Sequence, residues 1–310
     1  MQNKTITIFG GTGFIGRHIV AALAADGWQI KIACRVPARG YFLKAGAAPG
    51  QIVPMYCNVH DDASVAAIIE GSSHVLNLIG ILYQKGKSTF QKMHVDVPER
   101  LARLAAAANV ADFVHVSALG ADRDGASRYA RSKAEGEEKI RTVFPAATIL
   151  RPSIVFGPGD HFFGLFASMA QKAPVLPLIG FGKTLFQPVY VGDIAQAVLR
   201  IVSNQTHWPR GKTFALTGPE TLSFRALLQR LRQETGQKFI LLPIPFLFAK
   251  PLGAVLGLLP HPPLTLDQVQ SLTRDNVAAP GDYTLHDLNL DATALSSVLP
   301  AALRHFRQVS

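Results

Sequence analysis

Cysteine is scarce in this sequence, and no residues are spaced to bind a metal. Only two cysteines, Cys34 and Cys57, occur among 310 residues, without a CxxC motif or closely spaced histidines. This scarcity excludes a small scaffold held together by disulfides and offers no ligand set for a metal ion. Each cysteine ends a predicted strand, so we expect two reduced, buried thiols on neighbouring strands.

Charge is also sparse and one-sided. Asp and Glu number 21 against 31 Lys and Arg, which gives a formal net charge of +10, and charged residues are 17% of the chain against 48% hydrophobic. This hydrophobic content excludes disorder of the low-hydrophobicity type. Because no dense run of Lys and Arg occurs, we expect no nucleic-acid partner. The basic charge is interpreted as serving solubility or adhesion to an acidic surface.

No targeting segment or membrane span is expected in this sequence. The first predicted strand begins at Thr5, which leaves no room for a signal or transit peptide, so we expect a cytoplasmic protein unless processing has already removed a leader. One apolar stretch, residues 239–259, has the length of a membrane span but contains Pro243, Pro245 and Pro251. Broken backbone is not tolerated in hydrocarbon. We therefore expect a buried or groove-lining helix after an extended lead-in, with an interfacial anchor as the alternative.

The most informative feature present is a glycine-rich turn. An apolar strand over Thr5–Phe9 runs into a GxxGxxG motif, and a helical pattern follows over Arg17–Ala25. Glycines here leave backbone N–H groups open to a pyrophosphate and let the helix pack closely on its strand. This context favours a dinucleotide site over a chance glycine turn. The residues of the turn expected to contact the dinucleotide are Gly10, Thr12, Gly13, Phe14, Ile15 and Gly16.

Two arginines after the second predicted strand indicate which dinucleotide is bound. Arg35 follows the strand Gln29–Cys34 and lies nineteen residues after Gly16, where an NAD site usually has an acid for the ribose 2′-hydroxyl. Arg39 follows one short turn later. Guanidinium groups bind phosphate bidentately, so the pair predicts NADP(H) in preference to NAD(H). Two solvated surface arginines are the alternative.

Strands and helices alternate over the first half of the chain. The predicted strands are Thr5–Phe9, Gln29–Cys34, Ile52–Tyr56, His74–Leu78, Asp112–Ser117 and Ala147–Leu150, with returns to the sheet over Val189–Arg200 and Thr213–Leu216. This alternation predicts an α/β fold with a doubly wound parallel (Rossmann) sheet. We assign residues 1–155 and about 189–217 to the nucleotide-binding domain. Residues 156–188 and 218–310 are assigned to a smaller, discontinuous substrate lobe.

Three residues have side chains suited to acid–base chemistry. Tyr129 and Lys133 stand four residues apart on one helical face, and Ser117 ends the fifth strand at the carboxyl edge, where parallel sheets bind ligands. A nearby ammonium favours the phenolate, so we expect Lys133 to lower the pKa of Tyr129. Tyr129 could then exchange a proton with a substrate alcohol or carbonyl whose oxygen Ser117 holds.

Together these motifs resemble the short-chain dehydrogenase/reductase superfamily over nearly the whole chain. The resemblance implies that Ser117, Tyr129 and Lys133 are catalytic and that Lys133 also holds the nicotinamide ribose. The further cofactor contacts that it implies are Asn58 and Val59 at the adenine, Leu78, Ile79 and Gly80 after the fourth strand, and Pro152, Ser153 and Ile154 beside the nicotinamide.

The motif order is similar to an atypical branch of this superfamily, which contains the nucleotide-binding accessory subunit of respiratory complex I and its bacterial relatives. The segments that carry this likeness are Ser117–Ala121, Phe156–Phe162, Pro177–Gly180 and Gln187–Asp193. The branch implies tight NADP(H) binding and a partner in a respiratory complex, with a dinucleotide that can be structural. A peripheral position at the cytoplasmic face of the inner membrane would follow.

His94 departs from the family pattern, which has Asn in the middle of this helix and uses the backbone carbonyl there in a proton relay to the lysine. Pro98 stands four residues later, cannot donate to the carbonyl of His94, and should kink the helix. Our hypothesis is that His94 and Pro98 preserve the relay. A surface histidine at an early helix boundary is the alternative.

Two interpretations of function stay open at this point. The catalytic residues favour an oxidoreductase acting on a hydrophobic carbonyl or alcohol, such as a quinone-like or isoprenoid-like compound. The family resemblance, the net charge and the apolar tail favour a non-catalytic accessory or assembly subunit. A sugar-nucleotide epimerase or dehydratase is disfavoured by the twelve-residue spacing from Ser117 to Tyr129. The aromatic residues after the sixth strand form either core or a substrate pocket, and they are Phe156, Phe162, Phe163, Phe166, Phe181 and Phe186.

Overall fold

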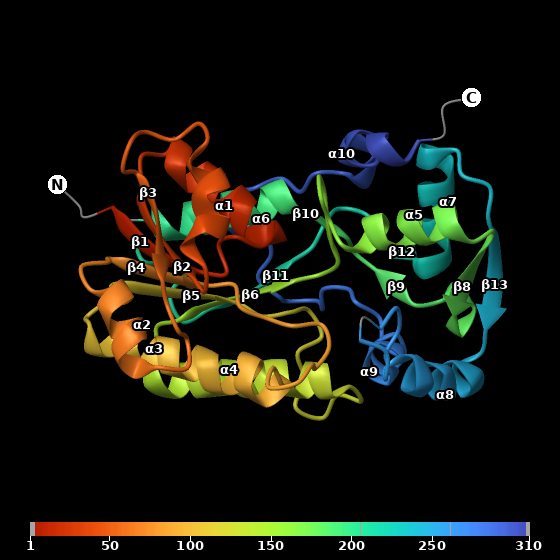
Figure 1. Ribbon diagram of the computed structural model, residues 1–310, viewed down its shortest axis with the longest axis horizontal. Helices are drawn as coiled ribbons and strands as arrows, with labels where there is room; N and C mark the ends of the chain where they lie inside the picture. The colour runs from red at the N-terminus through yellow and green to blue at the C-terminus, as the bar shows by residue number, and fades with distance from the viewer. Residues whose placement is uncertain (1–3, 205, 261, 308–310) are drawn as a thin grey trace.

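A seven-stranded parallel sheet forms the centre of the larger half of the protein (Figure 1). The computed structural model describes residues 4–204, 206–260 and 262–307. The strand order is β11-β6-β5-β4-β1-β2-β3, and every neighbouring pair is parallel. The strands are β1 (Thr5–Phe9), β2 (Gln29–Cys34), β3 (Ile52–Tyr56), β4 (His74–Asn77), β5 (Asp112–Val116), β6 (Thr148–Pro152) and β11 (Thr213–Leu216). The predicted doubly wound Rossmann fold is confirmed.

Helices cover both faces of this sheet. One face carries α1 (Phe14–Ala25) and α6 (Val191–Val202), and the other carries α2 (Asp62–Ile69), α3 (Val97–Ala107) and α4 (Arg128–Val143) (Figure 1). Short helices are η1 (Pro37–Lys44) after β2 and the π-helix η2 (Gln91–Asp96) before α3. Right-handed crossovers of this kind bring the carboxyl ends of all seven strands to one edge, where ligands bind.

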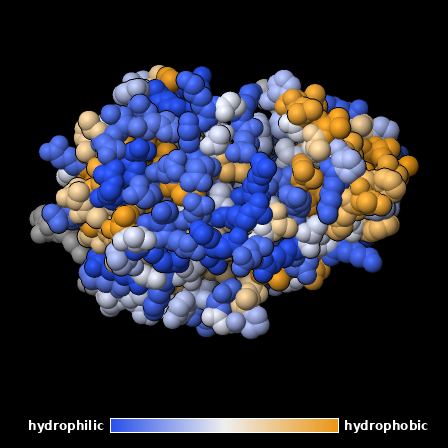
Figure 2. Space-filling view, turned by 90° about the horizontal axis from the view of Figure 1, so that it is seen from below, coloured by the Kyte–Doolittle hydropathy of each residue, from blue (hydrophilic) through white to orange (hydrophobic). Residues whose placement is uncertain are grey.

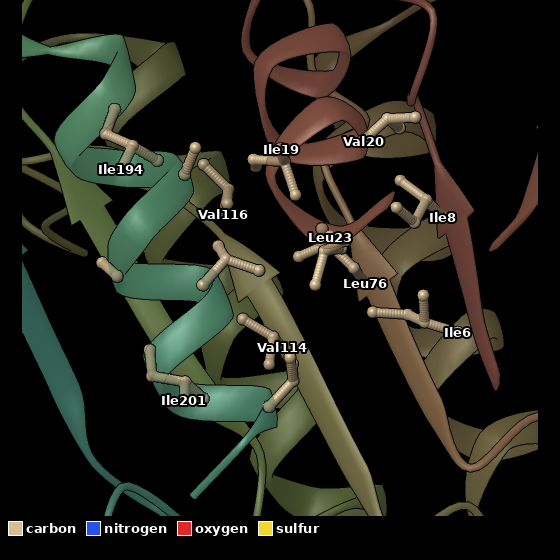
Figure 3. Close-up of a cluster of buried hydrophobic side chains, with 14 of the residues drawn as sticks. Ile6, Ile8, Ile19, Val20, Leu23, Leu76, Val114, Val116, Ile194 and Ile201 are labelled. Atoms are coloured by element: carbon tan, nitrogen blue, oxygen red, sulfur yellow. The ribbon is translucent and has the colours of Figure 1, made fainter. Parts of the chain in front are cut away.

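The core between α1, α6 and the sheet is built from β-branched and leucine side chains. Ile6 and Ile8 of β1 point toward Ile19 and Leu23 of α1, and Ile194 of α6 belongs to the same buried cluster (Figure 3). Alternate residues of a strand face opposite sides of the sheet, so each strand contributes to both cores. This packing fixes the end of β1 and the start of α1 relative to each other.

A smaller lobe lies beside the sheet. Its strands are β7 (Val155–Phe156), β8 (Val175–Ile179), β9 (Leu185–Phe186), β10 (Val189–Tyr190), β12 (Leu222–Ser223) and β13 (Ile240–Ile244). Its helices are α5 (Phe162–Lys172), η3 (Gly180–Gly182), α7 (Phe224–Thr235), α8 (Phe246–Leu256), α9 (Leu266–Ser271), α10 (Leu295–Ala302) and η5 (Arg304–Phe306). The short helix η4 (His286–Leu288) packs against α6 of the larger half instead. Three of the six aromatic residues, Phe156, Phe163 and Phe186, are buried in the core of this lobe, as the core interpretation predicts, whereas Phe181 is exposed.

Two sequence expectations need correction. Of the two segments expected to return to the main sheet, only Thr213–Leu216 joins it. The other forms the two-residue strand β10, which pairs with β7, and then helix α6. The apolar stretch 239–259 has the expected extended lead-in, β13, but its helix α8 is not buried: only Ala249 and Gly253 are. Within the described part of the chain, no helix is long and apolar enough to cross a membrane.

The two cysteines lie on adjacent segments, as predicted. Both thiols are buried and free, and the Cys57 amide donates to the Cys34 carbonyl at 2.9 Å. The described residues contain no group of three or more His, Cys, Asp or Glu placed to hold a metal. The domain division stays a prediction, although Leu285 and Leu288 pack into the core of the nucleotide-binding half.

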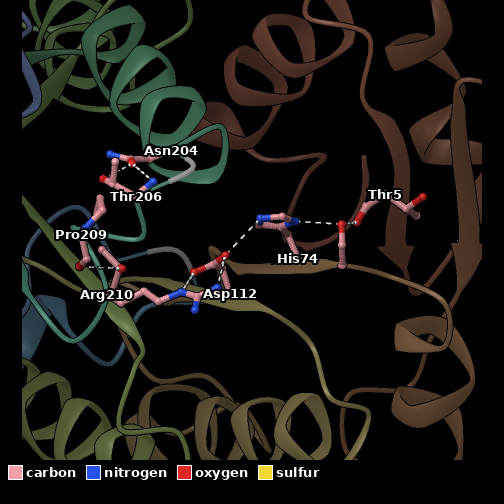
Figure 4. Close-up of polar contacts among 9 residues, drawn as sticks. Thr5, His74, Asp112, Asn204, Thr206, Pro209 and Arg210 are labelled. Atoms are coloured by element: carbon pink, nitrogen blue, oxygen red, sulfur yellow. Dashed lines mark hydrogen bonds and ion pairs between the residues drawn. The ribbon is translucent and has the colours of Figure 1, made fainter. Parts of the chain in front are cut away.

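A polar chain joins the amino ends of β4 and β5, at the opposite edge from the expected site (Figure 4). The Asp112 carboxylate accepts two bonds from Arg210, at 2.6 and 3.0 Å, and its other contact is His74 Nε2 at 3.2 Å. Burial alone would raise the pKa of Asp112, but the bonds from His74 and Arg210 hold it well below its usual range. This ion pair fastens the loop before β11 and has no part in the chemistry below.

Candidate active site at the carboxyl edge of the sheet

The glycine turn after β1 leaves a free helix N-terminus. Gly10 has a φ of +87°, and the Gly13 amide donates to its carbonyl at 3.1 Å. A Cβ at Gly16 would stand 2.4 Å from the Gly10 carbonyl oxygen, so only glycine fits there. The first turn of α1 has no acidic residue and no side-chain cap. Its N–H groups can therefore donate hydrogen bonds to an anion such as a pyrophosphate.

Arg17 is a contact of this turn that sequence reasoning missed. Its guanidinium donates to the carbonyls of Pro158 and Gly159 at 3.2 and 3.1 Å, and it lies 5.5 Å from the centre of the Phe14 ring. These bonds tie the start of α1 to the loop after β7. The sequence signal that could have identified Arg17 is a cationic residue directly after the last glycine of the GxxGxxG motif.

The two arginines expected at the ribose are both exposed at the carboxyl end of β2. Arg35 follows the last residue of β2, and Arg39 lies in η1, whose first turn is closed by its amide donating to Val36 at 3.0 Å. Within the described ranges neither guanidinium is paired with a carboxylate. Both are therefore available to an external anion.

The remaining predicted cofactor residues follow the strands along the same edge. Asn58 is exposed after β3, and its side-chain oxygen accepts from the His60 amide at 3.2 Å. Leu78 packs against Gly10, where a Cβ would approach it to 3.2 Å. Ser153, after β6, donates to the Asn276 side chain at 2.7 Å. The others of this set, at the same strand ends, are Val59, Ile79, Gly80, Pro152 and Ile154.

The three predicted catalytic residues converge at this edge. Ser117 directly follows β5, is buried, and its hydroxyl has no partner within the described structure. Lys133 Nζ lies 6.0 Å from the centre of the Tyr129 ring and donates to the Val116 carbonyl at 3.4 Å. A Cβ on Gly80 would stand 3.2 Å from the same Nζ. The ammonium therefore lies between the catalytic helix and the loop after β4.

The pKa of Tyr129 differs from the sequence expectation, and the pKa of Lys133 is shifted as well. Burial, together with the carboxylate of Asp267, raises the pKa of Tyr129 to about 12. Burial lowers the pKa of Lys133 to about 8, against a smaller opposing effect of Glu137. The expected lowering of the Tyr129 pKa was wrong because desolvation of the phenolate outweighs an ammonium that burial itself disfavours. The phenol is protonated at neutral pH.

The lowered pKa of Lys133 predicts that this lysine destabilises the folded protein at neutral pH. The pKa is about 8 in the folded chain against 10.5 for an unperturbed lysine, so the unfolded chain binds more protons between these values and stability rises with pH across that window. We expect Lys133→Met to stabilise the unliganded protein at pH 7 by about 1–3 kcal/mol, with a gain that shrinks as pH rises toward 10. Lys139→Met, at an exposed position of α4, is the control. Denaturant unfolding from pH 7 to 10 measures both, and an equal effect of the two substitutions would contradict the prediction.

His94 is a buried member of the site rather than a surface residue. Its Nε2 accepts from the Ile81 amide at 3.0 Å, its Nδ1 bonds the Ser132 hydroxyl at 2.9 Å, and its ring stands edge-on to Tyr129 with ring centres 5.3 Å apart. Burial and the charge of Lys133 lower its pKa to about 2. His94 is therefore neutral with its proton on Nδ1, and it joins the loop after β4 to the catalytic helix.

The predicted kink around His94 is present as the π-helix η2. Pro98 supplies no N–H to the His94 carbonyl, and the Val97 amide bonds Lys92, five residues back. That carbonyl lies against α4, where a Cβ on Gly136 would come within 1.9 Å of its oxygen. The relay hypothesis remains a proposal, and Gly136 is the residue that permits this close approach.

Asp267 was invisible to sequence reasoning. Its carboxylate accepts from the amides of Arg128 and Tyr129 at 2.6 and 3.1 Å, while the Ser127 hydroxyl accepts from Ala130 at 3.1 Å. Two side chains thus cap the N-terminus of α4, and one of them comes from α9 in the smaller lobe. No local pattern links Asp267 to a helix that begins 139 residues earlier.

Three features lie on one edge of the parallel sheet: the free helix N-terminus, the exposed arginines and the Ser117–Tyr129–Lys133 group. They define a dinucleotide-binding α/β protein of the short-chain dehydrogenase/reductase type. Residues 6–216 match the NAD dependent epimerase/dehydratase family, and the chain belongs to this family. The predicted family resemblance is confirmed.

Three comparisons place the chain among known proteins. It is 34% identical to NADH dehydrogenase (ubiquinone) 1 alpha subcomplex subunit 9 of Rattus norvegicus mitochondria over 304 residues, 97% of this chain and 80% of that protein. It is 33% identical to a ceramide reductase of Caulobacter vibrioides over 178 residues, 56% of this chain and 53% of that protein. An Escherichia coli NADPH-dependent quinone oxidoreductase has the same fold, with a TM-score of 0.76 at 19% identity over 96% of this chain and 99% of that one.

Proposed function

We propose that the protein is an NADP(H)-dependent oxidoreductase that reduces the carbonyl of a hydrophobic compound. The observation that carries this proposal is the unpartnered hydroxyl of Ser117, which directly follows the residue whose carbonyl Lys133 bonds. The ring of the protonated Tyr129 lies 6.0 Å from the same lysine nitrogen. An orphaned buried hydroxyl at a reaction centre is accounted for by a ligand that completes its hydrogen bonding. The names of two similar proteins, a ceramide reductase and a quinone oxidoreductase, agree with a lipid-like or quinone-like substrate.

The residues fit the cofactor that the fold implies. The N-terminus of α1 and the glycine turn would hold the pyrophosphate, Arg35 and Arg39 the 2′-phosphate, and Lys133 the nicotinamide ribose. When bound, the nicotinamide supplies or accepts a hydride. The chain itself would bind the substrate oxygen through Ser117 and deliver a proton to it from the Tyr129 hydroxyl. A pKa of about 12 keeps Tyr129 protonated, which favours carbonyl reduction over alcohol oxidation at neutral pH.

A second candidate is a non-catalytic accessory subunit with a fixed dinucleotide. The likeness to a subunit of a mitochondrial NADH dehydrogenase over nearly the whole chain favours it. In this case a respiratory complex is the partner, and the protein lies peripherally at the cytoplasmic face of the inner membrane. Epimerisation or dehydration of a sugar nucleotide is a third and weaker candidate, and the family name includes epimerases and dehydratases.

Mass spectrometry of ligands retained through native purification would test these candidates first. Release of NADP(H) together with an apolar carbonyl or alcohol would support the oxidoreductase. NADP(H) that stays bound for hours without exchange, and no turnover of a panel of apolar ketones and quinones, would favour the accessory subunit.

Cofactor preference is expected to depend on Arg35. NADPH should bind at least roughly tenfold more tightly than NADH, about 1.4 kcal/mol, through charge-assisted contacts to the 2′-phosphate. Arg35→Asp should reverse the order because a carboxylate repels that phosphate and accepts from a ribose hydroxyl. Calorimetry with both nucleotides measures the ratio. Arg232→Asp, on the exposed surface of α7, is the charge-matched control. Equal affinities in the unsubstituted protein would overturn the assignment.

A further inference from the structure

The far end of the smaller lobe carries an exposed apolar surface that the proposed reaction does not use. Six residues of β13, α8 and the turn after α8 make up this apolar end face: Ile240, Leu242, Leu247, Phe248, Val255 and Leu258. Each is between 52% and 86% exposed. Figure 2 shows apolar side chains gathered at this end of the molecule, at the right of the view, next to a largely hydrophilic remainder. Contiguous exposed apolar surface of this kind marks an interaction site.

Helix α8 is oriented so that its apolar residues face outward. A surface helix normally buries an apolar stripe and exposes polar residues. Here the buried residues are the small Ala249 and Gly253, and a Cβ on Gly253 would meet the backbone of Thr265 and Leu266 at 3.0 Å. Helix α8 therefore packs closely on the start of α9 through its small residues. The large side chains of Leu247, Phe248 and Val255 remain exposed.

The segment that carries the apolar end face, residues 236–266, contains only positive charges. Residues 236–266 contain lysines at 238 and 250 and no Asp or Glu. Lys183, Arg225 and Phe181 line a surface hollow, and Phe181 lies in the turn η3. This turn packs against the start of α8, since a Cβ on the neighbouring Gly180 would stand 2.4 Å from the Phe246 ring. Apolar side chains bordered by cations complement an anionic lipid surface.

We propose that the apolar end face docks the protein peripherally onto an anionic bilayer. The six apolar side chains enter the boundary between headgroups and acyl chains, and Lys250, Lys183 and Arg225 meet lipid phosphates. A lipid surface fits better than a protein partner because none of the six side chains offers a hydrogen-bond donor or acceptor. Pro243 also removes an amide from β13, which would weaken the addition of a partner strand.

This docking goes beyond the proposed reaction, but the fold connects the two. Helix α8 packs on α9, and Asp267 of α9 caps the helix that carries Tyr129 and Lys133. A bilayer that holds α8 would therefore also hold the segment that caps the helix of Tyr129 and Lys133.

The test measures binding of the full-length protein to sedimented vesicles of phosphatidylcholine, alone or mixed with phosphatidylglycerol. We expect binding to the mixed vesicles that salt weakens. The double substitution Phe248→Ser/Val255→Ser should reduce it by roughly tenfold or more, since two exposed apolar side chains lose their burial in lipid. The matched control, Phe42→Ser/Val53→Ser, removes the same side chains from exposed positions of the nucleotide-binding half and should change binding less than twofold.

A second variant tests whether residue 248 enters the lipid, separately from how tightly the protein binds. Phe248→Trp should show a blue-shifted emission when phosphatidylglycerol vesicles are added, because the indole leaves water. No binding of the unsubstituted protein, an equal loss in both double variants, or an unshifted emission would overturn the proposal. So would a loss of self-association, seen by sedimentation without lipid, in the Phe248→Ser/Val255→Ser variant alone, since the face would then be an interface between two copies of the chain.

Discussion

Tyr129→Phe should lower the turnover of a reducible apolar carbonyl by about 10²–10⁴-fold while leaving NADPH affinity nearly unchanged. The substitution removes one hydroxyl and keeps the ring, so its edge contacts with Phe90 and His94, with ring centres 5.9 and 5.3 Å apart, are retained. The groups expected to bind pyrophosphate and 2′-phosphate lie on other elements. Single-turnover oxidation of bound NADPH, followed by nicotinamide fluorescence, would separate the chemical step from binding.

Lys133→Ala is the informative companion to this variant. It should lower both rate and NADPH affinity, because Lys133 is expected to hold the ribose as well as to stand beside the phenol. Equal turnover in Tyr129→Phe and in the unsubstituted protein would remove Tyr129 from the mechanism. If the unsubstituted protein turns over no carbonyl in a broad panel, the accessory-subunit interpretation becomes the better account.

Gly136→Ala should be the most disruptive single-methyl change in the catalytic helix. The added Cβ would come within 1.9 Å of the His94 carbonyl oxygen, and both partners are backbone, so α4 or η2 must shift. We expect a loss of about 2–4 kcal/mol in the free energy of unfolding. Because Tyr129 and Lys133 are on the same helix, activity should fall as well.

A helical glycine elsewhere in the chain provides the control. Gly164 lies in α5, and a Cβ there would meet nothing within 4 Å. Gly164→Ala should leave stability unchanged or raise it by up to about 1 kcal/mol, the usual gain from replacing glycine in a helix. Urea unfolding of the two variants side by side gives the comparison. Similar stabilities would mean that α4 and η2 are not held together at His94.

The elements that sequence reasoning predicted are those with a local cause. The β-branched run of β1 and the spacing of Gly10, Gly13 and Gly16 specify strand, turn and helix within sixteen residues, and the structure has them there. Pro98 likewise predicted an irregular helix around His94 from its missing N–H alone. These features depend on neighbours in the sequence, so a single chain is enough to find them.

What sequence reasoning missed depends on contacts between distant segments. The pKa of Tyr129 is set by burial and by Asp267, which lies 138 positions later, and neither is visible around the Tyr-Lys motif. Helix α8 was expected to be buried or to line a groove, because apolar residues usually are covered. Instead, the helix packs on the start of α9 through the small residues Ala249 and Gly253. This contact depends on α9, so the sequence of α8 alone does not predict it.

The return of the chain to the nucleotide-binding half limits how this protein could be recombined. After building most of the smaller lobe, the backbone comes back so that Tyr283 accepts from the Ala215 amide at 2.7 Å and Leu285 and Leu288 complete the core beside α6. A chimera made by exchanging everything after β11 with a relative would therefore import part of the nucleotide domain's own core. An exchange of the smaller lobe alone would have to keep Leu285 and Leu288 of this chain in place beside α6.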